Sequence, residues 1–204
     1  MEGKIMRKFL ITCFLIILTQ NVHAEDKQYI IDDSHFSLGF LVEHAGYAKT
    51  LGLFKHIDGS FIYNADKNTV KDILITVNTD SVFTNHEKRD AHLRSPDFLN
   101  VNKYPVMIFS SDFTDLNTSS GIIKGQLTLL GQTKPLALNF KINKIAKYPF
   151  RIGLTKPIVM GVSGNAKFRR SDFGMTYGVS KNLVGDMIES VSYTHLRAHE
   201  TPCH

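Results

Sequence analysis

Apolar and polar residues alternate along most of the chain from Tyr29 onward, the pattern of β-strands with one buried face. In residues 35–44, Phe36, Leu38, Phe40 and Val42 fall on one face, and mostly polar or small residues fall on the other. Similar stretches predict a strand that begins at residue 61 and further strands at residues 70–77, 105–111, 122–130, 135–142 and 157–168. Turn signals are expected to separate them at residues 58–59, 117–121, 131–132 and 164–165.

One charged stretch, residues 84–99, breaks this alternation. Ala91, Leu93 and Phe98 no longer follow a two-residue period, so the stretch predicts a short helix and a loop, with Pro96 ending the helix. Many short strands with a single short helix predict an all-β fold, either a sandwich or a barrel.

The first 24 residues have the three zones of a signal peptide. Lys4, Arg7 and Lys8 form a basic region, residues 9–18 form an apolar run, and residues 22–24 (VHA) end in a small-residue cleavage pattern. A membrane anchor is the alternative, but the apolar run is about half of the ~20 residues that a spanning helix needs. We therefore expect residues 1–24 to be removed on export and residues 25–190 to form a single domain.

Charge and cysteine content narrow the function classes. The formal net charge of +5 is inflated by the basic leader, so electrostatic steering toward nucleic acid is weak. The two cysteines, Cys13 and Cys203, lie in the leader and in the last residues, so the expected domain has no thiol. The chain also has no Gly-x-Ser-x-Gly, phosphate-loop or His-Glu-x-x-His motif. We expect a binding protein with no catalytic residues, no metal site and no nucleic-acid partner.

Several blocks in a fixed order carry a family resemblance. The strongest runs through residues 80–84 (DSVFT), 88–93 (KRDAHL) and 97–99 (DFL), and residues 125–131 (GQLTLLG) and 169–175 (RRSDFGM) follow. With these blocks, the chain resembles the YceI-like family of polyisoprenoid-binding proteins from Tyr29 to about Glu189. The resemblance implies a lipocalin-like, antiparallel β-barrel of about eight strands, exported to the periplasm, whose elongated apolar interior holds an isoprenoid chain.

The alternation also predicts which apolar side chains point inward. From the residues alone, these side chains either fill a solid core or surround a cavity, because small barrels do both. The resemblance favours the cavity. The expected cavity residues are Phe36, Phe40, Phe54, Phe61, Ile75, Val77, Phe109, Leu127, Leu129, Leu138 and Phe140.

A charged cluster in the non-alternating stretch is the candidate site for the polar end of a ligand. Arg89, Asp90 and His92 lie there, and an Arg with an imidazole can hold a polar or phosphorylated headgroup. The alternative for Arg89 and Asp90 is a structural tie between the helix and the barrel wall. His44 continues the inward parity of residues 36–42, and we expect it either to reach the headgroup or to satisfy a buried hydrogen bond.

Residues 169–174 (RRSDFG) form a second polar segment, which we expect to be a loop. Asp172 with Arg169 or Arg170 is expected to hold this loop closed, and Phe173 to plug the barrel. The segment therefore predicts a structural or gating role.

The sequence thus predicts a protein that binds a long-chain isoprenoid lipid, polyprenyl or quinone-like, as a periplasmic carrier or sequestering protein without a cofactor. Transient contact with a membrane fits that role. The alternative is an exported stress or interaction protein with a packed barrel core and no ligand. The oligomeric state stays open, with a homodimer as one option.

The end of the chain does not fit the strand pattern. A closing strand begins at Val184, but residues 191–204 hold three His residues and Cys203 and show little alternation. One interpretation is a metal-binding tail, because His195 and His199 have helical spacing. The other, which we favour, is a non-native ending that replaces half of the final strand. The barrel would then lack some of its closing hydrogen bonds.

Overall fold

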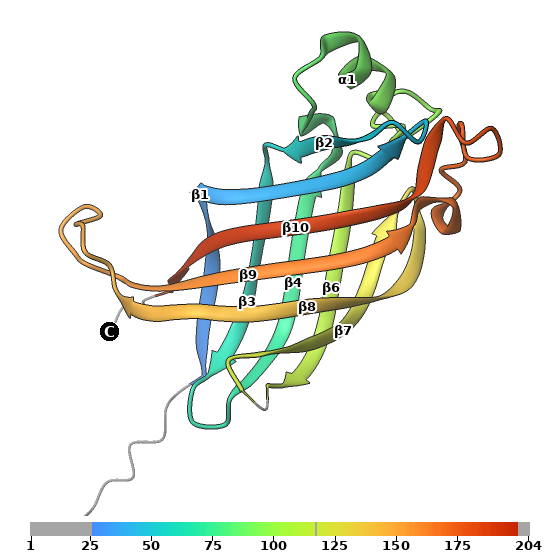
Figure 1. Cartoon of the computed structure of the whole chain (residues 1–204). Helices are drawn as coiled ribbons and strands as arrows, with labels where there is room; N and C mark the ends of the chain where they lie inside the picture. The colour runs from blue at the N-terminus through green and yellow to red at the C-terminus, as the bar shows by residue number, and fades with distance from the viewer. Residues whose placement is uncertain (1–25, 117, 200–204) are drawn as a thin grey trace, which may run out of the picture.

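Long alternating strands curl into one closed antiparallel sheet (Figure 1). The computed structural model describes residues 26–116 and 118–199. Within these ranges, eight strands form a ring. In ring order they are β10 (Val184–Ala198), β9 (Ile158–Arg169), β8 (Gln132–Lys147), β7 (Ser120–Leu129), β6 (Val106–Asp115), β4 (Thr69–Asn78), β3 (Ile57–Asn64) and β1 (Lys27–His44). Pairing of β10 with β1 closes the ring, which removes its free edges and turns one face of every strand inward. The predicted eight-stranded antiparallel barrel is confirmed.

Strand β1 is long enough to pair with two strands along one of its edges. Its first residues pair with β3, and its second half pairs with β2 (Ala48–Phe54), while β10 runs along both parts. The short strand β5 (Val82–Phe83) pairs antiparallel with the last two residues of β2. Between Ile31 and Phe36 the register slips, so residues 32–35 leave the ladder as a bulge.

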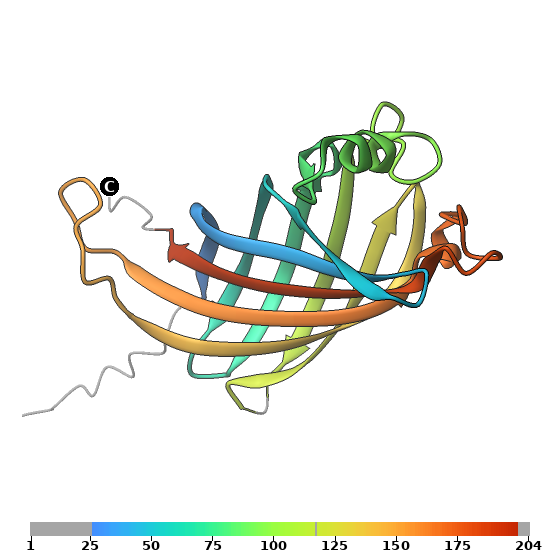
Figure 2. The ribbon, with the colours of Figure 1, turned by 45° about the horizontal axis from the view of Figure 1, so that its top comes forward.

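Helical segments lie at one end of the barrel (Figure 2). Helix α1 (Glu87–Arg94) follows η1 (Thr79–Ser81) and β5, and η2 (Arg170–Phe173) follows β9. His86 is the N-cap of α1, and its Nδ1 accepts a hydrogen bond from the Arg89 backbone N–H at 3.2 Å. The helix predicted within residues 84–99 is confirmed, and it ends two residues before Pro96.

The inward side chains form two buried groups along the barrel. One group includes Phe61 and Met160, and the other, nearer α1, includes Phe54 and Phe98. Ile75 packs against both groups. The interior is therefore apolar over the length of the barrel.

Two predicted turns are wrong, because residues 58–59 lie inside β3 and residues 164–165 lie inside β9. A Cβ on Gly59 would lie 2.7 Å from the Leu74 carbonyl oxygen, and one on Gly164 would lie 3.0 Å from Ser192 Oγ. These glycines mark places where a neighbouring strand approaches closely, which is a second use of glycine in sheets.

The prediction of an incomplete closing strand is also wrong. Strand β10 continues to Ala198 and pairs with β9 through Arg197 and with β1 through Ala198. Arg197 donates two hydrogen bonds, at 2.9 and 2.5 Å, to the carboxylate of Asp32 in the β1 bulge, and they hold the pKa of Asp32 well below its usual range. Two long-range ladders and an ion pair therefore outweigh the weak alternation of this segment. Its non-native origin stays a prediction.

The expected signal peptide lies outside the described residues, as do both cysteines. Among the residues that are described, no helix is long and apolar enough to cross a membrane.

Candidate functional site

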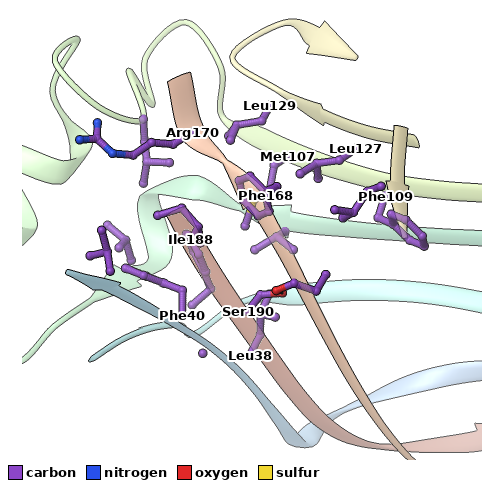
Figure 3. Close-up of a pocket in the computed structure, with 18 of the residues that line it drawn as sticks. Leu38, Phe40, Met107, Phe109, Leu127, Leu129, Phe168, Arg170, Ile188 and Ser190 are labelled. Atoms are coloured by element: carbon purple, nitrogen blue, oxygen red, sulfur yellow. The ribbon is translucent and has the colours of Figure 1, made fainter. Parts of the chain in front are cut away.

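The barrel encloses an apolar cavity of about 200 Å³ next to the α1 end. Figure 3 shows side chains from β1, β6, β7, β9 and β10 turned toward one space, with Phe40, Phe109 and Phe168 among them. Strand β5 adds Val82, and the loop after α1 adds Phe98. The walls are therefore aromatic and branched aliphatic groups supplied from around the ring.

A second, smaller cavity of about 60 Å³ continues the first along the barrel. It is lined by the buried group around Phe61 and Phe140. The two cavities share five lining residues, which are Leu38, Ile57, Ile75, Leu138 and Ser192. The interior is thus one elongated apolar bore with a narrowing at these shared side chains.

Glycines on neighbouring strands make room for the rings that line the bore. A Cβ on Gly52 of β2 would collide with the ring of Phe40, and a Cβ on Gly125 of β7 would collide with the ring of Phe109. In both places the end of the ring occupies the space that a Cβ would need, so any larger residue would displace it. The local sequence therefore fixes where these two aromatic walls stand.

The polar groups at the wall of the larger cavity already have partners. Ser190 Oγ donates to the Ala166 carbonyl and Ser192 Oγ donates to the Gly164 carbonyl, each at 3.4 Å. Arg170 is 1% exposed and is the charged residue that lines this cavity. A guest chain therefore meets walls that offer little hydrogen bonding.

The Arg170 guanidinium clamps the segment between η2 and β10. It donates four hydrogen bonds of 2.8 Å each: Nε to Gly185, Nη1 to Met175, and Nη2 to both Tyr177 and Val184, all to carbonyl oxygens. The guanidinium also stacks above the Phe98 ring at 5.7 Å. Burial lowers the pKa of Arg170, but guanidinium stays charged in proteins. Arg170 therefore holds the chain closed over this end of the bore.

The structure places all eleven predicted cavity residues on the wall of the bore. Eight line the larger cavity: Phe40, Phe54, Ile75, Val77, Phe109, Leu127, Leu129 and Leu138. The other three, Phe36, Phe61 and Phe140, line the smaller one. Contact of these residues with a lipid stays a prediction.

Arg89 and Asp90 form a structural tie rather than part of the cavity wall. Arg89 donates from Nε to Thr84 Oγ1 and from Nη2 to the Thr84 carbonyl, both at 2.7 Å. The buried carboxylate of Asp90 accepts hydrogen bonds from the Thr84 N–H, at 2.8 Å, and from the Thr84 hydroxyl. This network joins α1 to the end of β5, so the structural alternative describes these two residues better than the headgroup prediction.

The buried hydrogen bond that was one of the two expectations for His44 is wrong, because His44 is the exposed last residue of β1. Val42 lines the larger cavity, whereas His44 lines neither cavity. The ladder with β2 is regular through both residues, so His44 keeps the parity of Val42, and it is exposed because β1 ends there.

His92 lies at the rim, separated from the cavity by one ring. It packs edge-on against Phe98 at 5.0 Å and against Tyr177 at 4.9 Å, and its Nε2 lies 2.9 Å from Asp97 Oδ2. Phe98 lines the cavity and Tyr177 is partly exposed. Of the four predicted headgroup residues, His92 is the one placed beside an end of the bore.

In residues 169–174, the partner of the basic side chain is not the one predicted. Asp172 is exposed, while Asp186 of β10 pairs with Arg169 Nη1 at 3.1 Å and accepts hydrogen bonds from Ser171. Asp186 takes the role predicted for Asp172 because β10 runs beside this loop. The local sequence does not show that β10 is a neighbour of the loop. Phe173 is buried against Phe168, with 5.5 Å between ring centroids, and fills the barrel end.

Sequence reasoning missed Arg170 and Phe98 as parts of the site. Both lie in segments without alternation, so the two-residue period says nothing about the direction of their side chains. No local signal set Arg170 apart, because it lies between Arg169 and Ser171 in a polar run. No group of His, Cys, Asp and Glu that could hold a metal ion is present in residues 26–116 and 118–199.

Comparisons with known proteins agree with this architecture. The profile of the YceI-like domain matches residues 29–191. A UPF0312 protein of Shewanella baltica is 37% identical over 177 residues, covering 83% of this chain and 88% of that protein. The crystal structure of the Campylobacter jejuni YceI protein superimposes with a TM-score of 0.66 at 26% identity, covering 78% of this chain and 90% of that one.

A more distant likeness extends the comparison of the fold. A polyisoprenoid-binding domain from Saccharophagus degradans superimposes with a TM-score of 0.61 at 12% identity, covering 86% of this chain and 100% of that domain. The profile match spans nearly the whole described barrel, and the Shewanella relative is identical at 37% of the 177 aligned residues. By sequence and by fold, the chain belongs to the YceI-like family.

Proposed function

We propose that this protein binds one long isoprenoid lipid inside the barrel. The observation that carries the proposal is the apolar bore, two cavities joined end to end at Leu38, Ile75 and Leu138. A solid core would not leave this elongated space. The polyisoprenoid-binding domain of Saccharophagus degradans, which has the same fold, supports the choice of an isoprenoid.

The chemistry of the walls favours a hydrocarbon chain. Transfer of a methylene group from water into an apolar site contributes about 0.8 kcal/mol, and the serines at the wall already donate to strand carbonyls. Aromatic rings such as Phe40 and Phe109, beside leucines and isoleucines, suit a methyl-branched chain. Affinity would therefore come from the length of chain buried, with few polar contacts.

The polar end of the lipid is proposed to lie at the rim beside α1. His92, Tyr177 and Asp97 present an imidazole, a phenol and a carboxylate within one cluster around Phe98. These groups can exchange hydrogen bonds with an alcohol or a quinone. His92 and Tyr177 replace the tied Arg89 and Asp90 as the proposed headgroup contacts.

The proposed role is transport or sequestration of this lipid in the periplasm, without catalysis and without a cofactor. The leader-like residues 1–24 support export. The polyisoprenoid-binding domain of Saccharophagus degradans, which has the same fold, supports a binding protein. A lipid that is insoluble in water needs such a carrier to cross an aqueous space.

Native mass spectrometry of freshly purified protein tests the proposal. We expect a population heavier than the polypeptide by the mass of a prenyl lipid, which organic extraction removes and identifies. The alternative, a ligand-free stress or interaction protein, predicts a single unliganded mass. It also predicts no uptake when the stripped protein is incubated with prenyl alcohols, and that pair of results would overturn the proposal.

A further inference from the structure

We propose that the hairpin between β8 and β9 docks the barrel onto a bilayer that contains anionic phospholipid. This hairpin, residues 148–157, is called here the β8–β9 tip. It projects from the end of the barrel opposite α1 (Figures 1 and 2). The proposal adds a surface to the proposed lipid-binding function and does not depend on it.

The apex of the tip is apolar and exposed. Leu154 is 91% exposed and Phe150 is 68% exposed, and neither belongs to a buried cluster. Two-residue hairpin turns usually carry Gly, Asn or Asp, yet here Leu154 follows Gly153 at the centre of the turn. Large apolar groups at the most exposed point of a loop commonly mark an interaction surface.

Backbone hydrogen bonds hold the tip in a defined shape. Ile152 and Thr155 exchange two backbone hydrogen bonds, at 2.9 and 3.3 Å, and Gly153 has the positive φ of 61° that the turn requires. Further down, the Tyr148 N–H donates to the Pro157 carbonyl at 2.8 Å. The two apolar side chains are therefore presented on an ordered hairpin, which reduces the entropy lost on docking.

Basic residues on the tip and at the end of β8 have no acidic partner in the part of the chain that the structure describes. Lys144, Lys147, Arg151 and Lys156 are all exposed, and none of them has an ion pair within residues 26–116 and 118–199. Between Asp115 and Asp172 the sequence contains no Asp or Glu. An apolar apex with cations along both arms of its hairpin matches a membrane surface, where acyl chains lie beneath a layer of anionic phosphates.

The opposite end of the barrel provides a contrast. Tyr47, in the β1–β2 turn, is 92% exposed, but Glu43 is close to that turn and Lys49 beside it is paired with Glu189 at 2.6 Å. An exposed aromatic residue without free cations along both arms of its hairpin is a matched control for the tip.

Fluorescence of single-tryptophan variants tests insertion. The chain has no Trp, so Phe150→Trp and Tyr47→Trp each carry one indole, at opposite ends of the barrel. With phosphatidylcholine vesicles that contain phosphatidylglycerol, we expect blue-shifted emission and quenching by brominated acyl chains for Phe150→Trp only. An unchanged spectrum for Phe150→Trp, or equal changes in both variants, would overturn the proposal.

Vesicle co-sedimentation tests the cations. A Lys or Arg near an anionic surface contributes about fivefold to the partition coefficient, so Lys147→Gln/Arg151→Gln/Lys156→Gln is expected to lose about a hundredfold. The matched control Lys88→Gln/Lys103→Gln/Lys181→Gln removes the same charge from the α1 end and is expected to change binding less than fivefold. Equal losses would indicate attraction by net charge alone, and capture of an acidic protein without vesicle binding would indicate a protein partner; either result contradicts the proposal.

These vesicles contain no isoprenoid, so the outcome is independent of whether the bore holds one. Thermal unfolding of each variant confirms that the barrel is intact. Phe150, Leu154 and the three cations are exposed, so their replacement is expected to leave the melting temperature within a few degrees of the parent.

Discussion

The chemical type of a residue in this barrel does not by itself predict its position or its partners. Arg89 and Arg170 are both arginines in non-alternating segments, but Arg89 ties Thr84 outside the bore, whereas Arg170 lies buried at its wall. The difference follows from partners that are distant in sequence, since Arg170 bonds carbonyls as far away as Gly185. The sequence could therefore predict that these segments are polar, but not which arginine would be buried.

At the residue scale, Arg170→Met is expected to lower the free energy of unfolding by at least about 3 kcal/mol, because it leaves buried carbonyl groups without donors. Urea denaturation measures the loss. Arg169→Met is the control, since the Arg169 side chain is 60% exposed and its pair with Asp186 is expected to contribute at most about 1 kcal/mol. Similar losses in the two variants would contradict the clamp.

Among the elements, the strands were the most predictable part of the fold. A two-residue period predicts directly which face of a strand is buried. All eleven apolar residues that were predicted to point inward line the bore. Strand ends and strand contacts were less predictable: His44 is exposed because β1 ends there, and close strand approach, not a turn, explains Gly59 and Gly164. Strand β10 shows the same limit, because its pairing depends on β1 and β9 rather than on its own alternation.

At the element scale, ending the chain after Ser190 is expected to destabilise the barrel by at least about 3 kcal/mol. The truncation removes the ladders of residues 191–198 with both neighbours, the buried side chain of Leu196 and the Arg197–Asp32 pair. Ending the chain after His199 keeps all of these and is the control. Equal melting temperatures for the two truncations would mean that this half of β10 does not close the barrel.

For the whole molecule, closure of the ring and the hollow interior are separate properties. Alternation and turn signals predict a closed or sandwiched sheet, but the volume left inside depends on how side chains from opposite strands meet. Here Phe40 and Phe109 lie against glycines on neighbouring strands, and the bore stays open between the walls. The family resemblance, not the residue pattern, favoured a cavity.

The length dependence of lipid binding tests the central claim most directly. Titration of stripped protein with prenyl alcohols, from farnesol to solanesol, is expected to show affinity that rises by about fourfold for each methylene buried, until the bore is full. Leu138 lies at the narrowing between the cavities, so Leu138→Trp is expected to stop this rise at a shorter chain while leaving the shortest alcohol unaffected. Ile122→Trp, on the exposed face of β7, is the control and is expected to behave as the parent. Affinity that is independent of chain length, or no binding of any prenyl alcohol, would contradict the account.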